Sequence, residues 1–299
     1  MEILRTSGLS KNYGKIRALD QLELVVNKGE VMGLLGPNGS GKTTTLGIIL
    51  DILNPTSGTF EWFEGQYGDN PRKHIGSILE TPNFYPYLNA YENLEIVRQI
   101  KKVDDKNFDD LLKKVNLYER RFSSFKTYSL GMKQRLAIAA TLIGNPDVLI
   151  FDEPTNGLDP KGISEVREIL QGFTNEGKTV IMASHILAEV EKICSHVAII
   201  RKGKLLASGA VGSVIKDDVI LELSSENLDT LRNFLGTIPQ IKSITDKGVF
   251  LECEASSDLD AYTINKLAWK ADINLGHIVV RKSSLEEEFL QVTKEYNDV

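Results

Sequence analysis

Apolar and polar positions along the first two thirds of the chain follow the pattern of an α/β protein, in which short buried strands alternate with helices. The run Val31–Leu35 is apolar and stops at Gly36-Pro37, which predicts a buried strand that enters a turn. Residues 148–151 and 180–183 repeat this pattern. A helical pattern follows the first strand at 43–53. We therefore expect a mixed sheet with helices packed on it.

Two other parts of the chain have different patterns. Residues 85–135 are polar, helical in pattern and poor in β-branched runs, which predicts a helical insertion beside the sheet. After Lys216 the pattern predicts the order β-α-β-β-α-β of a small ferredoxin-like α+β module, followed by a helix that Ser284 and Glu287 begin with capping-box spacing. We expect two domains, residues 1–215 and 216–299. The elements predicted in the second are strand 219–223, helix 228–235, hairpin 243–253, helix 259–271 and strand 277–280.

Composition narrows the class of protein. The 299 residues are 41% hydrophobic and 25% charged, as in ordinary globular proteins of about two domains. The net charge of −6 argues against a nucleic-acid partner, because a phosphate backbone requires a basic surface. Cys194 and Cys253 belong to no Cys-x-x-Cys pair. We therefore expect neither a structural metal site nor a disulfide framework, and a reducing cytosol.

The chain has no pattern of membrane insertion. Residues Met1–Arg5 lack the apolar stretch of a signal peptide, and no apolar run approaches the roughly 18 residues of a spanning helix. Any membrane association is therefore expected to be peripheral, at the cytoplasmic face.

The stretch after the first strand fits the pattern G-x-x-x-x-G-K-[ST] of a phosphate-binding loop. Its glycines would let backbone N–H groups turn towards phosphate oxygens at the start of a helix. Lys42 is expected to reach the β- and γ-phosphates, and the Thr43 hydroxyl to bind Mg²⁺. The alternative is a chance match, which the flanking strand and helix disfavour. The expected nucleotide-binding residues here are Gly36, Pro37, Asn38, Gly39, Ser40, Gly41, Lys42, Thr43 and Thr44.

A pair of carboxylates ends the apolar run at 148–151. Asp152 is placed to hold Mg²⁺ through water, and Glu153 to polarise the water that attacks the γ-phosphate. A second carboxylate at this position favours hydrolysis over slow signalling turnover. The alternative is an acidic capping pair before Pro154.

Between these motifs lies Tyr128-Ser129-Leu130-Gly131-Met132, a Ser-x-Gly turn that opens a helix. With the phosphate loop and the acidic pair, it makes residues 1–215 resemble the nucleotide-binding subunit of an ABC transporter. The turn stands where that family has Leu-Ser-Gly-Gly-Gln, with Leu130 in place of the first glycine. The resemblance implies that Ser129 and Gly131 contact ATP held by a second copy of the chain. An N-capped helix without a ligand is the alternative.

Further matches to this family follow along the chain. Asp159, in Gly157-Leu158-Asp159-Pro160, resembles the D-loop residue that contacts the opposite subunit. His185, after a buried strand, resembles the switch histidine that contacts the γ-phosphate, and Tyr13 matches the aromatic residue that stacks on adenine. A structural histidine and an ordinary half-buried aromatic residue are the respective alternatives.

One position departs from the family. A glutamine usually ends the strand after the phosphate-loop helix, whereas this strand is followed by Glu80. A carboxylate cannot donate the hydrogen bonds of an amide, and it repels a γ-phosphate unless Mg²⁺ intervenes. We expect Glu80 to contact Mg²⁺ or the attacking water. The alternative places Glu80 in a linker away from the metal.

The resemblance also implies partners. A homodimer would enclose two ATP molecules, and a separate integral-membrane permease would use the motion. The stretch Phe84–Leu88 is a candidate to receive a cytoplasmic helix of that permease, or else it packs the helical insertion.

The turn Tyr128–Met132, called the signature turn below, is similar to that of bacitracin and lantibiotic exporters. So are Glu80 and the C-terminal appendage that ends in Ser284–Leu290. Export of a peptide antibiotic is therefore the expected function, which would give resistance or immunity. Multidrug, ion or polysaccharide export is the alternative. A non-transport ATPase that binds ribosomes or DNA fits less well, because no heptads separate Thr43 from Ser129 and the chain holds one cassette.

Overall fold

The computed structural model describes the chain apart from residues 69, 105, 215–217, 283 and 296–299. The chain forms two compact units, Met1–Val211 and Gly212–Val299. The boundary predicted between 215 and 216 lies outside the described residues.

A six-stranded sheet forms the centre of the first unit, in the order β5-β6-β7-β3-β8-β9. Neighbouring strands are parallel except for β9, which runs antiparallel to β8. Every residue of β3, β6 and β7 is buried, in keeping with the continuous apolar runs of these strands. The predicted mixed sheet is confirmed. Its strands are β3 (Val31–Leu35), β5 (Ile75–Ile78), β6 (Val148–Asp152), β7 (Thr179–Ser184), β8 (His196–Arg201) and β9 (Lys204–Ala210).

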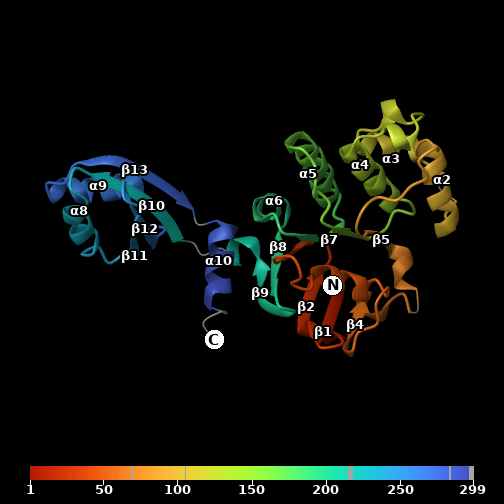
Figure 1. The fold of residues 1–299 in the computed structure, drawn as a ribbon, viewed down its shortest axis with the longest axis horizontal. Coiled ribbons are helices and arrows are strands. Elements are labelled where there is room, and N and C mark those ends of the chain that lie inside the picture. The colour runs from red at the N-terminus through yellow and green to blue at the C-terminus, as the bar shows by residue number, and fades with distance from the viewer. Residues whose placement is uncertain (69, 105, 215–217, 283, 296–299) are drawn as a thin grey trace. The chain divides into compact units, whose positions relative to one another are not determined.

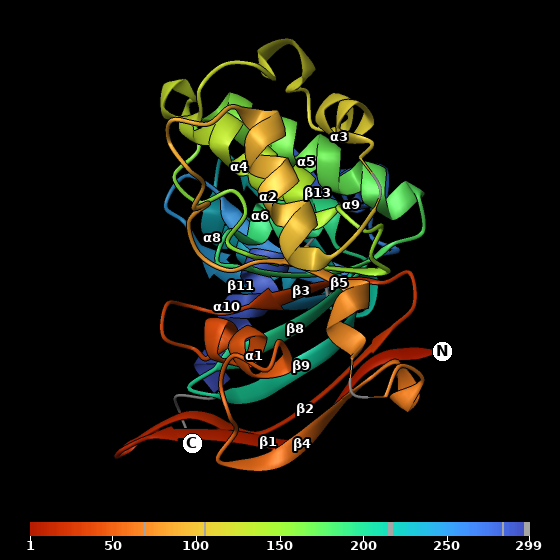
Figure 2. The same cartoon turned by 90° about the vertical axis from the view of Figure 1, so that its right-hand side faces the viewer.

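A second, antiparallel sheet was not predicted. It has the order β2-β1-β4, with β1 (Glu2–Tyr13), β2 (Ile16–Asn27) and β4 (Ser57–Trp62). Its strands mix buried and exposed positions and carry register shifts, so they lack the continuous apolar runs of the central strands. Helix α1 (Lys42–Ile49) lies between the two sheets, where its Leu46, Ile48 and Ile49 join their common core (Figure 2). The helix ends at Ile49 rather than at Leu53.

The remaining helices of this unit cover the other face of the six-stranded sheet (Figures 1 and 2). They are α2 (Ala90–Lys101), α3 (Phe108–Lys114), α4 (Leu130–Thr141), α5 (Pro160–Asn175) and α6 (Leu187–Ile193). Helices α2 and α3 lie within the predicted insertion, and α4 begins there and continues to Thr141. A capping box begins α2, because Glu92 N donates to Asn89 Oδ1 at 3.0 Å and Asn89 N donates to Glu92 Oε2 at 2.8 Å. Single 3₁₀ turns occupy Phe63–Gly65, Pro71–His74, Tyr118–Arg120 and Phe125–Thr127.

The second unit has the predicted ferredoxin-like order and an antiparallel sheet of order β11-β12-β10-β13. Leu231 and Leu235 of α8 and Ile264 of α9 form one core with the apolar face of the sheet. The predicted capping box also forms, with Ser284 N donating to Glu287 Oε2 at 2.9 Å and Glu287 N donating to Ser284 Oγ at 3.3 Å. The elements after the short helix α7 (Val211–Val214) are β10 (Asp218–Ser225), α8 (Leu228–Leu235), β11 (Ile241–Asp246), β12 (Leu251–Ser256), α9 (Ala261–Lys270), β13 (Leu275–Lys282) and α10 (Leu285–Glu295).

Candidate nucleotide-binding site

The phosphate loop joins the end of β3 to the start of α1 and is closed on one side and open on the other. A β-carbon on Gly36 would lie 2.2 Å from Ile200 O and 2.4 Å from Ser40 Oγ, so only glycine fits there. Gly39, by contrast, has a φ of 77° and no atom within 4 Å of a β-carbon placed on it. The loop therefore packs against β8 and leaves Pro37, Asn38 and Gly39 exposed. An exposed, glycine-rich turn before a helix is the geometry that receives phosphate oxygens.

Lys42 folds back over this loop. Its side chain is 6% exposed, and Nζ donates to Gly36 O at 2.7 Å and to Pro37 O at 3.3 Å. Nζ also lies 3.6 Å from Glu153 Oε1. A buried ammonium held only by two carbonyl groups and one carboxylate is placed to exchange those contacts for phosphate oxygens.

Thr43 and Asp152 bring together the start of α1 and the end of β6. Thr43 Oγ1 donates to Asp152 Oδ2 at 2.8 Å, while the other carboxylate oxygen, Oδ1, is buried without a hydrogen-bond partner. Burial raises the pKa of the Asp152 carboxyl, against the hydrogen bond from Thr43 that lowers it. Two oxygen ligands, one of them unpaired in a buried position, fit a magnesium ion whose other ligands come from phosphate and water.

Glu153 and His185 lie at the carboxyl ends of the adjacent strands β6 and β7. His185 Nδ1 lies 2.8 Å from Glu153 Oε2, and Glu153 N donates to Ala183 O at 3.0 Å. Glu153 has a φ of 50°, in the left-handed region that non-glycine residues rarely adopt. Such a conformation costs of order 1–3 kcal/mol and persists where surrounding contacts hold it. Here the strained backbone directs the Glu153 carboxylate between Lys42 and His185.

Glu80 is brought to the same place from the end of β5. It is exposed and also has a positive φ, 62°. It lines a cavity of about 350 Å³ with Thr81, Pro82, Leu130, Gln134, Asp152, Glu153 and Asn156. The three carboxylates Glu80, Asp152 and Glu153 therefore face one cavity, where the negative charges of Glu80 and Glu153 add to the rise in the pKa of Asp152.

The signature turn and the D-loop line a second cavity, of about 420 Å³. Ser129 caps α4, where its Oγ accepts a hydrogen bond from Met132 N at 3.3 Å. Asp159 caps α5 in the same way, with Gly162 N donating to Oδ1 at 2.8 Å. Among the described residues, those lining this cavity include no member of the phosphate loop. Thus one chain places Ser129, Gly131 and Asp159 around a cavity that its own Lys42 does not line.

Tyr13 ends β1 and is 46% exposed, with Lys11 Nζ 5.2 Å from the centre of its ring. The turn after it leads into β2, which lies against the phosphate loop: a β-carbon on Gly41 would be 2.7 Å from Ala18 O. The ring is therefore exposed on a hairpin that is packed on the loop. Its stacking on adenine stays a prediction.

The sequence patterns did not identify two cations that hold helix α4, the buried Arg135 and the partly buried Lys101. Arg135, 8% exposed, donates from Nη1 to Val115 O at 3.2 Å and to Asn116 O at 2.9 Å, and it pairs with Glu165 of α5 at 3.4 Å. Lys101 Nζ donates to three carbonyl groups at the end of α4, including Ile143 O at 3.0 Å, and burial lowers its pKa to about 8. The sequence signal for Arg135 was a charge directly before the apolar run that starts at Leu136.

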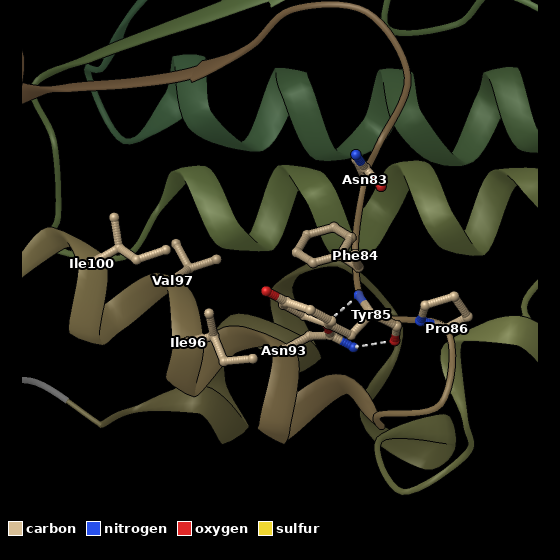
Figure 3. Close-up of a pocket in the computed structure, with 8 residues that line it drawn as sticks. All are labelled: Asn83, Phe84, Tyr85, Pro86, Asn93, Ile96, Val97 and Ile100. Carbon is tan, nitrogen blue, oxygen red and sulfur yellow. Dashed lines mark hydrogen bonds between the residues drawn. The ribbon is translucent and has the colours of Figure 1, made fainter.

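The stretch after Glu80 forms one wall of an apolar groove of about 450 Å³ (Figure 3). Tyr85 N donates to Asn93 Oδ1 at 2.9 Å, and Asn93 Nδ2 donates to Tyr85 O at 3.3 Å, which fixes the loop on α2. Phe84 packs on Phe125 with ring centres 5.3 Å apart, whereas Tyr87 is 70% exposed. The groove is lined by Asn83, Phe84, Tyr85, Pro86, Asn93, Ile96, Val97 and Ile100.

Within the described part of the chain, no helix is both long enough and apolar enough to span a bilayer.

Comparison with known proteins places the chain in one family. A family model described as ABC transporter matches residues 19–156. The uncharacterised ABC transporter ATP-binding protein YdbJ of Bacillus subtilis is 35% identical over 99% of this chain and 97% of its own length. The bacitracin transport ATP-binding protein BcrA of Bacillus licheniformis is 44% identical over 68% of each chain. The lantibiotic transport ATP-binding protein SrtF of Streptococcus pyogenes is 42% identical over 68% of this chain and 89% of its own.

Solved structures have the same fold over the first unit's share of the chain. An ATP-binding subunit of an ABC transporter aligns with 71% of this chain and 91% of its own, at a TM-score of 0.63 and 30% identity. A dimeric ATP-binding cassette in a post-hydrolysis state, bound to ADP and Pi, aligns with 70% and 98%, at a TM-score of 0.62 and 27% identity. Sequence, fold and site geometry agree, and the chain therefore belongs to the ATP-binding proteins of ABC transporters, which are ATPases.

Proposed function

We propose that two copies of this chain enclose two ATP molecules and use their hydrolysis to drive export of a peptide antibiotic through a separate membrane permease. The observation that carries the proposal is the division of the site. Thr43 and Lys42 join the phosphate loop to the carboxylates Asp152 and Glu153 within one chain, whereas Ser129, Gly131 and Asp159 line another cavity. Two copies in opposed orientation would complete two sites at once.

In this proposal the chain's residues bind and orient the nucleotide. Lys42 would exchange its contacts with Gly36 O and Pro37 O for the β- and γ-phosphates. Thr43 and Asp152 would hold Mg²⁺, which would bridge phosphate oxygens and neutralise the charge that develops on them. The unpaired Oδ1 of Asp152 is the observation in favour of that ion. Tyr13 would stack on adenine.

Glu153 is the proposed general base for the attacking water. His185, 2.8 Å from its Oε2, would fix the carboxylate and reach the γ-phosphate. Because a positioned general base contributes about 10²–10⁴ to a rate, Glu153 should dominate hydrolysis.

Glu80 shares the cavity with Asp152 and Glu153, so we propose that it contacts Mg²⁺ or the attacking water. A Glu80→Gln variant tests this role, because the amide keeps the shape and removes the charge. We expect an altered Mg²⁺ dependence of phosphate release. A variant that hydrolyses and transports like the parent would refute the role of Glu80 and leave the rest of the proposal intact.

The groove beside α2 is the proposed docking site of the permease. Its wall is mostly apolar, and Ile100 and Tyr85, which line it, are 74% and 50% exposed, so it offers an exposed apolar surface to a short amphipathic helix. The chain would then lie at the cytoplasmic face of the membrane through this contact. Ile100→Asp should abolish co-purification with the permease and leave basal ATP hydrolysis unchanged.

The cargo is proposed from the relatives. BcrA and SrtF are named for bacitracin and lantibiotic transport, and they share 44% and 42% identity with this chain over 68% of its length. A multidrug, ion or polysaccharide exporter would use the same ATPase and remains the second candidate. Expression of the chain with its permease in a bacitracin-sensitive host tests the cargo. Resistance that disappears in a Glu153→Gln variant supports peptide export, and unchanged sensitivity to bacitracin and to lantibiotics contradicts it.

A further inference from the structure

Leu130 stands where the family's signature has a glycine, and the structure gives this side chain a definite place. It is the first residue of α4 and is 43% exposed. It lines the cavity of Glu80, Asp152 and Glu153, and it also lines the cavity of the signature turn and D-loop. Leu130 thus forms a wall common to the chain's own catalytic cavity and the surface proposed to meet the second copy.

On the D-loop side Leu130 packs against Gly157. A β-carbon placed on Gly157 would lie 3.3 Å from Leu130 Cδ2, and the φ of Gly157 is 74°. Glycine is therefore favoured at 157 both by its backbone conformation and by the leucine beside it. A glycine at position 130 would make no such contact.

A short hydrogen-bonded segment connects Gly157 to Glu153, the proposed general base. Asn156 N donates to Glu153 O at 3.1 Å, and Leu158 N donates to Thr155 O at 3.3 Å. These two turns hold Glu153 and Gly157 within one short hydrogen-bonded segment. Leu130 lies beside Gly157 and directly follows Ser129 in the chain, so it connects Gly157 with Ser129.

We infer that Leu130 is a positioning residue that couples each subunit's own catalytic site to the signature turn it lends to the other subunit. The inference rests on the proposed dimeric function and specifies its regulation. When one site binds ATP and its Glu153 takes up its catalytic position, the contact of Leu130 with Gly157 orients Ser129 and Gly131 for the second site. Binding at the two sites should therefore be cooperative through this contact.

Leu130→Ala tests the coupling, because alanine removes the contact and retains helix propensity at the start of α4. Binding of a fluorescent ATP analogue to the monomer should be unchanged. In a Glu153→Gln background, ATP-driven dimerisation should require at least about five-fold more ATP, the lower end of ordinary coupling between sites. The Hill coefficient of hydrolysis should fall towards about one. Leu130→Met, which conserves volume, should restore both values.

Val249→Ala provides a matched control, because Val249 is 76% exposed in the other unit and should change neither readout. A double-mutant cycle of Leu130→Ala with Gly157→Ala tests whether the coupling between the two sites passes through the contact of Leu130 with Gly157. The added methyl group meets Leu130, so its effect on dimerisation should be smaller in the Leu130→Ala background.

Strictly additive effects of the two substitutions would overturn the inference, as would an unchanged Hill coefficient and dimerisation in Leu130→Ala. Either result in a parent that hydrolyses ATP as a dimer leaves the proposed function standing. A parent that neither hydrolyses ATP nor dimerises would overturn both.

Discussion

The two units of this chain differ in how many buried polar atoms lack a hydrogen-bond partner and in how many non-glycine residues have positive φ. Among the described residues of Met1–Val211, five buried side-chain atoms lack a partner, including Ser40 Oγ and Asp152 Oδ1, and ten non-glycine residues have positive φ, including Glu80 and Glu153. In the described part of Gly212–Val299, no buried side-chain polar atom lacks a partner, and Asp272 is the only non-glycine residue with positive φ. Unpaired polar atoms and strained backbone cost free energy, and at the candidate site a bound nucleotide and metal ion would use those of Asp152 and Glu153.

Several charged side chains of the second unit form ion pairs with each other. Arg281 forms ion pairs with Glu222, Glu252 and Glu287, at 3.3, 3.3 and 2.7 Å. Lys242 binds Asp218 at 2.6 Å. Among the described residues, the unpaired buried side-chain atoms therefore lie in the first unit, which also holds the candidate site, whereas the second unit has a network of ion pairs around Arg281.

The largest effect should come from the catalytic carboxylate. Glu153→Gln should lower the rate of phosphate release by about 10²–10⁴ and retain ATP binding, because the general base is lost while the phosphate loop is intact. Phosphate release under saturating Mg²⁺ and ATP measures this. Glu226→Gln is the control, since Glu226 is an exposed glutamate of the second unit. A Glu153→Gln variant at the parental rate would remove the assigned base.

Loss of a core side chain in the second unit should damage stability but not chemistry. Leu221 is fully buried, so Leu221→Ala should destabilise that unit by about 2–5 kcal/mol through lost transfer energy and a cavity. Urea unfolding followed by far-UV circular dichroism measures the change. The specific ATPase activity of the folded protein should match the parent. A fall in activity below the unfolding transition would show that the second unit takes part in hydrolysis and would break the comparison.

The exposed aromatic residue near the phosphate loop should affect binding alone. Tyr13→Ala should weaken ATP binding by about 5- to 150-fold, if stacking on the base contributes about 1–3 kcal/mol. Isothermal titration with ATP measures the dissociation constant. Tyr87→Ala is a control, because Tyr87 is also exposed but lies by the α2 groove. Equal ATP affinity in parent and Tyr13→Ala would leave Tyr13 as an ordinary surface residue.

The smallest effect belongs to the ion pairs of the second unit. Arg281→Met should change the free energy of unfolding by about 0–1 kcal/mol, because partly exposed ion pairs contribute little and methionine retains an apolar stem. ATP hydrolysis should be unchanged. A loss of stability well above about 1 kcal/mol, or a loss of activity, would contradict this expectation for the Arg281 network.

Much of this fold follows from local patterns in the sequence. The strands Val31–Leu35 and Val148–Asp152 are marked by apolar runs, and helix Leu228–Leu235 by its spacing. The residues expected to contact phosphate could be recognised because the loop and its flanking strand and helix are contiguous in sequence. The antiparallel sheet β2-β1-β4 was not predicted, since bulges interrupt its alternation.

Other features depend on contacts between distant residues and could not be read from the chain. The positive φ values of Glu80 and Glu153 are set by packing, because glutamate has no intrinsic preference for that region. The contact of Leu130 with Gly157 joins a helix start to a loop that follows a later strand. No periodicity signals such a contact.

The central claim is that each active site is shared between two copies, and mixing two inactive variants tests it most directly. Glu153→Gln keeps its signature turn but lacks the base. Gly131→Asp keeps its base but places a carboxylate where the signature would meet the γ-phosphate. Its β-carbon would find the nearest neighbouring atom 3.9 Å away, so the substitution fits the fold. In a mixed dimer one site is intact, so the mixture should hydrolyse ATP although neither variant does alone. A mixture no faster than the sum of its components would contradict the account.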